Sequence, residues 1–151
     1  MQKLNLPNYS IKLKKDNNKV LVFDPIRKKY IILSPEEWVR QNFIQFLINE
    51  KGYPQSLISV ERGIDVGNTK KRCDIILFNN KGIPKIIVEC KAYSIQVSQQ
   101  AFDQIARYNM QLKSDLLVVT NGMQHYICRM DHENMCYKFL KEIPKYSEMN
   151  R

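Results

Sequence analysis

The feature that most constrains the fold is a pair of apolar segments joined by a short polar turn. Residues 73–78 and 85–91 have the composition of buried strands, and Asn79-Asn80-Lys81-Gly82 between them is typical of a hairpin turn. Both segments carry apolar residues at successive positions, so neither has a polar face. The chain is therefore predicted to contain an antiparallel hairpin within a sheet that is covered on both sides.

Three charged side chains interrupt this apolar hairpin. With a tight loop, Asp74 faces Glu89, and Lys91 follows two residues later, so all three are predicted to share one face. Close, buried carboxylates are unfavourable unless they are neutralised. A hard divalent cation would neutralise them, and an internal salt bridge to Lys91 is the alternative. The expected neighbours on this face are apolar: Ile76, Phe78 and Ile87.

The remaining patterns predict an α/β domain with a mixed sheet. A first helix is expected after Ser34, since serine is a good N-cap, Pro35 suits the first helical position and Glu37 completes a capping box; Gly52 is expected to end it. A second helix is predicted over residues 98–113. Its expected inner stripe is Ala101, Ile105, Tyr108 and Leu112. The other predicted strands are 20–23 and 30–33, which form an N-terminal hairpin, then 57–64, 115–120, 124–129 and one within 135–143.

Charge and cysteine usage narrow the class of protein. The formal net charge is +9, from 24 basic and 15 acidic residues, which favours polyanionic partners such as nucleic acid. None of the 4 cysteines forms a C-x-x-C pair, so a zinc knuckle is not expected. No apolar run is long enough to cross a membrane, and no signal peptide is evident, so we expect a cytoplasmic location.

Several motifs occur in an order that resembles a known family. In chain order they are Pro35-Glu36-Glu37-Trp38-Val39-Arg40-Gln41, Asp74, Glu89-Cys90-Lys91, Gln104-Ile105-Ala106-Arg107-Tyr108 and Thr120-Asn121-Gly122. Together they resemble the PD-(D/E)XK nuclease superfamily, and in particular the N-terminal nuclease domain of type I restriction enzyme R subunits. The resemblance implies a restriction-endonuclease-like fold, with a hairpin extension at residues 1–33 and one compact nuclease domain at residues 34–151.

The resemblance also assigns roles in the predicted site. Asp74 and Glu89 would bind Mg²⁺ or Mn²⁺, the backbone carbonyl of Cys90 would be a third ligand, and Lys91 would be the catalytic lysine. Cys73 stands where the superfamily's name has a proline. No G-x-x-x-x-G-K-[ST] loop occurs, so the resemblance extends to the nuclease part of an R subunit and not to its motor.

Two helices are expected to complete that site. Glu37 resembles the acid of the first helix that reaches the metal through water, with Glu36 as its rival. By position alone, either is a first-turn carboxylate favoured by the helix dipole. Gln104 and Tyr108 resemble residues that contact the site or the DNA backbone, although spacing alone would make Tyr108 a core residue.

We therefore expect a metal-dependent DNA endonuclease, with a homodimer left open because two copies could cut two strands. The alternative is a catalytically inactive nucleic-acid-binding module of the same fold. The choice between DNA and RNA is not set by the sequence.

Overall fold

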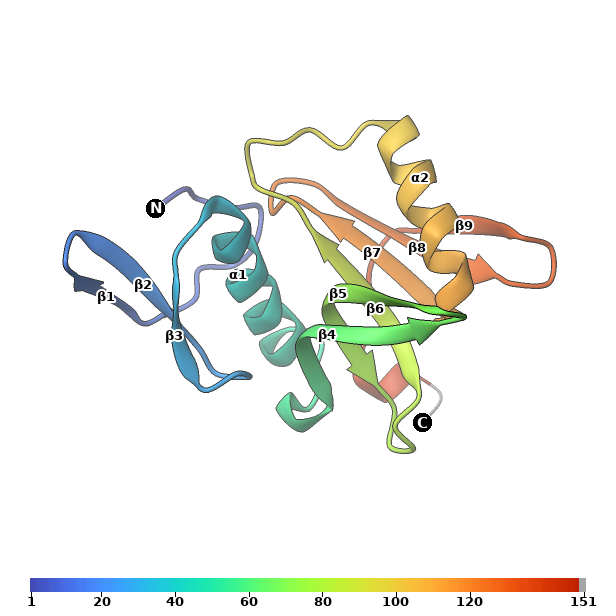
Figure 1. Ribbon diagram of the computed structural model, residues 1–151, viewed down its shortest axis with the longest axis horizontal. Coiled ribbons are helices and arrows are strands. Elements are labelled where there is room, and N and C mark those ends of the chain that lie inside the picture. Colours follow the sequence, from blue (N-terminus) through green and yellow to red (C-terminus); the bar gives the residue numbers. More distant parts are fainter. Residues whose placement is uncertain (150–151) are drawn as a thin grey trace.

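The computed structural model describes residues 1–149, with the side chains of residues 66, 69 and 71 left aside. These residues form two sheets and two α-helices (Figure 1). The elements are β1 Leu13–Asp16, β2 Lys19–Asp24, β3 Lys29–Ile32, α1 Pro35–Asn49, β4 Ile58–Val66, β5 Thr69–Phe78, β6 Pro84–Cys90, α2 Gln99–Asn109, β7 Leu116–Thr120, β8 His125–Asp131 and β9 Cys136–Leu140, with short 3-10 turns at Gln55–Leu57, Met110–Leu112 and Tyr146–Glu148.

The larger sheet is mixed and has the strand order β4-β5-β6-β7-β8-β9. β6 and β7 are parallel, and the other neighbours are antiparallel. A parallel pair needs a crossover, which α2 provides. α1 and α2 cover opposite faces of this sheet, so the predicted α/β class with a mixed central sheet is confirmed (Figure 1).

Each face of the large sheet has its own core. On the α1 face, alternate residues of β5, β6 and β7 pack against the helix, and on the α2 face the intervening residues do the same. Because successive strand side chains point to opposite faces, apolar runs without alternation serve both cores. The α1-side core includes Phe43, Leu47, Ile75, Leu77, Ile86, Val88 and Val118, and the α2-side core includes Ile76, Ile87, Phe102, Ala106, Leu117 and Val119.

The register of the central hairpin agrees with the prediction. Ile75 pairs with Val88 and Ile76 with Ile87, which is the alignment that a loop at Lys81-Gly82 requires. The register shifts at Phe78, at the turn end of the hairpin. The pairing next to Asp74 and Glu89 is therefore the expected one.

Both predicted helix starts are present, but the predicted inner stripe of the second helix is only partly correct. Ser34 and Ser98 cap α1 and α2 through their hydroxyl groups. α1 ends at Asn49, before Gly52, which has the positive φ of 75° typical of a glycine after a helix. The predicted α2 stripe is confirmed in part: Leu112 is buried and Ile105 packs against the core. It is wrong at Tyr108, which is 47% exposed, and it missed the buried Phe102 and Ala106.

The smaller sheet, of strand order β1-β2-β3, lies beyond α1 on the side away from the large sheet (Figure 1). β1 was not predicted, because Leu13–Asp16 is fully exposed and lysine-rich and so lacks an apolar pattern. The residues before it return to the main body: Leu4 is buried in the α1-side core, and the N–H of Asn5 donates to the carbonyl of Gly122 at 2.8 Å.

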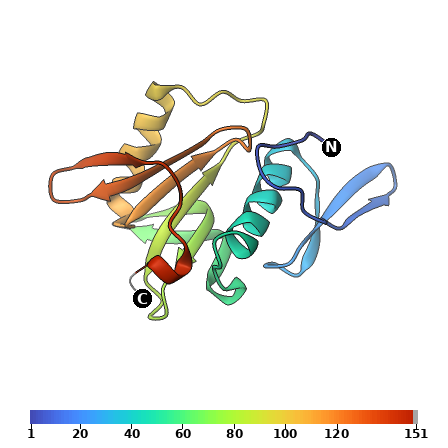
Figure 2. The same cartoon turned by 180° about the vertical axis from the view of Figure 1, so that it is seen from behind.

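The C-terminal segment crosses the α1 side of the large sheet (Figure 2). Ile143 is buried there, and the Tyr53 hydroxyl donates to the carbonyl of Pro144 at 2.7 Å. Among the described residues, no helix is long and apolar enough to cross a membrane.

Candidate active site

The N-terminus of α1 places three charged side chains at the edge of the large sheet. The Ser34 hydroxyl accepts from the N–H of Glu37 at 3.0 Å, which fixes the first turn. Residues three and four apart on a helix are neighbours, so Glu36 and Glu37 both lie beside Arg40. The capping sequence therefore determines where these charges stand.

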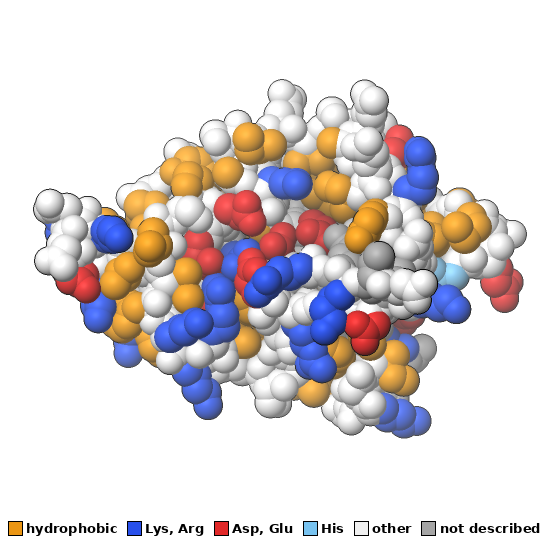
Figure 3. All heavy atoms as spheres, viewed as in Figure 1, with side chains coloured by type: hydrophobic (Ala, Val, Ile, Leu, Met, Phe, Trp, Pro, Cys, Tyr) orange, Lys and Arg blue, Asp and Glu red, His pale blue; other side chains and the backbone are white. Residues whose placement is uncertain are grey.

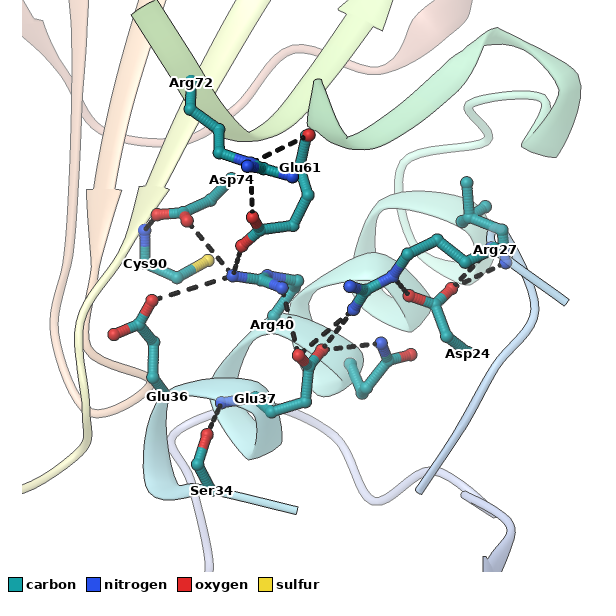
Figure 4. A network of polar contacts seen from close by, with 12 residues as sticks. Asp24, Arg27, Ser34, Glu36, Glu37, Arg40, Glu61, Arg72, Asp74 and Cys90 are labelled. Atoms are coloured by element: carbon teal, nitrogen blue, oxygen red, sulfur yellow. Dashed lines mark hydrogen bonds and ion pairs between the residues drawn. The ribbon is translucent and has the colours of Figure 1, made fainter. Parts of the chain in front are cut away.

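Arg40 is the centre of a buried ion network (Figure 4). Its side chain is 4% exposed, and its Nη2 lies 2.6 Å from Glu61 Oε1 and 3.1 Å from Asp74 Oδ1. Its Nη1 lies 3.0 Å from Glu37 Oε1, and Glu36 is more distant at 3.6 Å. Burial would lower the pKa of Arg40, but the surrounding carboxylates, Glu37 first, raise it.

Two further arginines extend the network outward. Arg27, in the turn between β2 and β3, contacts Glu37 at 3.1 Å and Asp24 at 2.6 Å. Arg72 contacts Glu61 at 2.8 Å. Among the described residues, the contacts drawn in Figure 4 join five carboxylates to three guanidinium groups. This network therefore contains two more acidic than basic groups.

Asp74 joins this network because β5 is irregular at that residue. Cys73 belongs to the α2-side core and Ile75, two residues later, to the α1-side core, so the alternation breaks between them. On the adjacent strand Glu61 has a φ of 56°, in the left-handed region. The break directs the Asp74 carboxylate toward α1. The prediction that Asp74 shares one face with Glu89 and Lys91, among Ile76, Phe78 and Ile87, is therefore wrong. Asp74 turns toward α1, whereas Glu89 and Lys91 line a cleft against α2.

The other Asp74 oxygen holds the end of β6. Oδ2 accepts from the N–H of Cys90 at 2.7 Å, so the carboxylate is fixed beside the residue that separates Glu89 from Lys91. Burial, followed by the charge of Asp74, raises the pKa of the Cys90 thiol well above its usual value. The thiol is thus a neutral part of the α1-side core, and Cys90 contributes through its backbone.

Glu89 and Lys91 line a cleft that opens beside the network. The cleft runs between the end of β6 and α2, with Gln104 and Tyr108 on its helical wall. Figure 3 shows acidic side chains gathered in a hollow at the centre of this face, with lysine and arginine around them. The full lining is Lys70, Arg72, Glu89, Lys91, Gln104, Ile105 and Tyr108.

The network and the cleft are connected electrostatically and through one shared residue. Arg72 lines the cleft and also pairs with Glu61. Burial and then repulsion from Asp74 raise the pKa of Glu36, while Arg40 and Lys91 act in the opposite direction. Glu36 therefore lies within the fields of both Asp74 and Lys91, and its side chain is 50% exposed.

The end of β7 supports the strand that carries Lys91. The N–H of Lys91 donates to the carbonyl of Thr120 at 2.8 Å. The Asn121 side chain donates to the carbonyl of Ile95 at 2.8 Å and accepts from the N–H of Gln124 at 2.8 Å. The motif Thr120-Asn121-Gly122 thus fixes the segment that follows Lys91 and needs no direct contact with a ligand.

The oxygen-rich composition of the site suits a hard divalent cation. Among the described side chains, no group of three His, Cys, Asp or Glu residues is arranged to hold a metal ion. The predicted ligand set needs only Asp74, Glu89 and the carbonyl of Cys90, since Mg²⁺ commonly binds one or two carboxylates and completes its shell with water. Within the described residues, each Asp74 oxygen accepts one hydrogen bond, which leaves a second lone pair for a cation.

Sequence reasoning missed two residues that the structure makes central. Arg40 neutralises and positions Asp74, and Glu61 contacts the same guanidinium group, whereas the sequence suggested Lys91 as the ionic partner. The sequence contains a signal for Arg40, which follows Glu36 and Glu37 at helical spacing and shares a helix face with residues expected to be buried. Nothing local to Glu61 reveals its left-handed backbone.

The fold and site define a class, and comparisons with known proteins identify the family. The architecture is that of a restriction-endonuclease-like mixed sheet. Residues 35–144 match the family described as the Type I restriction enzyme R protein N terminus, and the chain belongs to that family. No curated protein matches the chain.

One solved structure supports the fold. It is a fragment described as the HsdR subunit of a type I restriction enzyme from Vibrio vulnificus YJ016, with 22% identity and a TM-score of 0.52. The match covers 77% of this chain and 24% of the fragment, so the chain spans about a quarter of that structure's length.

Proposed function

We propose that the chain is a divalent-metal-dependent nuclease that hydrolyses DNA phosphodiester bonds. The observation that carries the proposal is the excess of carboxylates around Asp74, held beside a cleft that is lined by Glu89, Lys91 and basic side chains. The lining of the cleft contains three basic side chains and one carboxylate, which suits a phosphate, and a bound cation would offset the acids of the adjacent network. Membership of the type I R protein N-terminal family supports the same chemistry.

In this proposal Asp74, Glu89 and the carbonyl of Cys90 would hold Mg²⁺ or Mn²⁺, which when bound would polarise the phosphate and a water molecule. The Cys90 N–H and Arg40 hold the Asp74 carboxylate in place, so this ligand would be preorganised. Lys91 would supply positive charge where negative charge develops on the attacked phosphate.

The remaining roles follow from exposure and position. We assign the water-positioning role to Glu36 rather than to Glu37, because Glu37 is 6% exposed and already accepts from Arg27, Arg40 and Gln41. Gln104 and Tyr108 would contact the DNA backbone from the opposite wall of the cleft.

The test is cleavage of double-stranded, single-stranded and supercoiled DNA with Mg²⁺, with Mn²⁺ and with EDTA. The wild type is expected to cut only with a metal, and Lys91→Ala to lose roughly 10²–10³-fold in rate, as is usual when one charge-stabilising donor is removed. Lys138→Ala, an exposed lysine on β9, is the matched control and should keep full activity. No metal-dependent cutting of any form refutes the proposal.

A second candidate is an inactive module of the same fold that binds nucleic acid. The observation in its favour is that Arg40 already neutralises Asp74, which lowers the need for a cation. Such a module would bind DNA with a salt-dependent affinity, show no heat of Mg²⁺ binding by calorimetry and leave DNA uncut.

A further inference from the structure

The small sheet β1–β3 is the most basic part of the chain. Residues 12–32 contain seven Lys or Arg and two Asp, so they carry +5 of the total charge of +9. Of these charged side chains, Asp24 and Arg27 belong to the ion network, and the lysines are exposed. Figure 3 shows basic side chains along the end of the molecule that this sheet forms.

One face of the small sheet presents lysines over aromatic rings. In the register of β1, β2 and β3, residues 12, 14, 16, 19, 21, 23, 30 and 32 share this face, so its one acid, Asp16, lies opposite Lys19. Lys12 lies 5.6 Å from the centre of the Phe23 ring and Lys14 4.3 Å from that of Tyr30. The two rings contact each other edge to face at 5.2 Å. In both contacts the ammonium nitrogen itself lies over the ring, so the rings hold these charges on the exposed face of the sheet.

The opposite face fixes the small sheet to the main body. Val22 and Asp24 are fully buried there, and Asp24 accepts from the N–H groups of Ile26 and Arg27. Arg27 then contacts Glu37 on α1, the helix that carries Arg40. The lysine face is therefore mounted on the same helix as the candidate active site.

We propose that the lysine face of β1–β3 is a contact surface for the phosphate backbone of double-stranded DNA. On this face the exposed lysines Lys12, Lys14 and Lys19 outnumber the one acid, Asp16. Exposed ammonium groups match the phosphates of a duplex, and such contacts position the DNA without reading its sequence. The surface lies outside residues 35–144, so the family match does not account for it. The inference rests on the proposed function for its choice of nucleic acid, but it concerns binding and not cleavage.

A different role for these lysines is protection of a sheet edge. Lysines on exposed edge strands prevent pairing with another chain, and β1 and β3 are both edges. Edge protection alone predicts that removing the lysines leaves DNA affinity unchanged and promotes self-association. A DNA-binding role predicts that removing the lysines lowers the DNA affinity and does not promote self-association.

The experiment compares two triple variants of equal net charge. Lys12→Gln, Lys14→Gln and Lys19→Gln together remove the lysine face; the control triple Lys81→Gln, Lys138→Gln and Lys141→Gln removes exposed lysines elsewhere. Fluorescence anisotropy with a labelled DNA duplex in EDTA measures affinity as a function of salt. Circular dichroism and thermal unfolding establish that both variants are folded.

The lysine-face triple is expected to weaken duplex binding at least tenfold and to lower the slope of log affinity against log salt by up to about three, while the control changes little. Equal losses in both triples, or no loss in the first, overturn the inference. If the wild type cuts DNA but the two triple variants bind the duplex equally well, only this surface is refuted. Wild type that binds through the lysine face but never cuts refutes only the nuclease proposal.

Discussion

Replacing Arg40 by methionine tests the ion network, because it keeps most of the side-chain volume and removes the charge. Arg40 is 3% exposed and contacts Glu37, Glu61 and Asp74 within 3.1 Å. Removing one partner of a buried ion pair leaves uncompensated charge and costs about 3–5 kcal/mol. At roughly 2–4 °C per kcal/mol for a chain of this size, the melting temperature should fall by about 10 °C.

The assay is urea unfolding at neutral and at acidic pH, with Arg72→Met as the control. Arg72 also pairs with Glu61, but its side chain is 73% exposed, so its removal should cost about 1 kcal/mol or less. Unpaired, buried carboxylates in Arg40→Met would bind protons more tightly when folded than when unfolded. The stability deficit should therefore shrink as the pH falls toward 4, roughly the ordinary carboxyl pKa.

Two results would contradict this reasoning. A loss below about 1 kcal/mol would mean that the network is not a buried electrostatic unit. A large loss that stays constant with pH would mean that packing and not charge explains the effect. Arg40→Lys separates the two further, since it restores the charge without the several donors of a guanidinium group and should recover only part of the stability.

Two further predictions concern stability alone. Burial lowers the pKa of His125 from 6.5, so its contribution to stability is complete above that pH and is lost as the pH falls below it. The free energy of unfolding of His125→Gln should therefore depend less on pH below about 6.5 than that of the wild type, and an unchanged profile would count against this assignment. Ser34→Ala removes the hydroxyl that accepts from the Glu37 N–H and should lower the free energy of unfolding in urea by about 1 kcal/mol. Ser34→Gly should lower it by only about a few tenths of a kcal/mol. Equal losses in both variants would show that the hydroxyl is not the cause.

Much of the fold follows from patterns that the sequence carries locally. Ser34 and Ser98 mark helix starts through capping chemistry, and the turn after Phe78 fixes the register that aligns Asp74 with Glu89. These features depend on neighbours within a few residues. They are therefore readable without tertiary information.

The rest depends on contacts between distant segments. The carboxylate of Asp74 leaves its expected face because Glu61, on another strand, has a left-handed backbone, and because Arg40 on α1 attracts it. β1 has no apolar pattern, and pairs with β2 through backbone hydrogen bonds that any sequence can form. Tyr108 lines the cleft because contacts with the sheet, and not the apolar spacing alone, decide which face of the helix is buried.

The central claim is that Asp74 and Glu89 hold one divalent cation at the mouth of the cleft beside Lys91. The most direct measurement is an anomalous difference map from crystals of the protein soaked in Mn²⁺. The account predicts a peak within coordination distance, about 2.0–2.2 Å, of both carboxylates, and its absence in Asp74→Asn crystals soaked in parallel. Well-ordered Asp74 and Glu89 side chains with no peak between them, or a peak that persists in the variant, would contradict it.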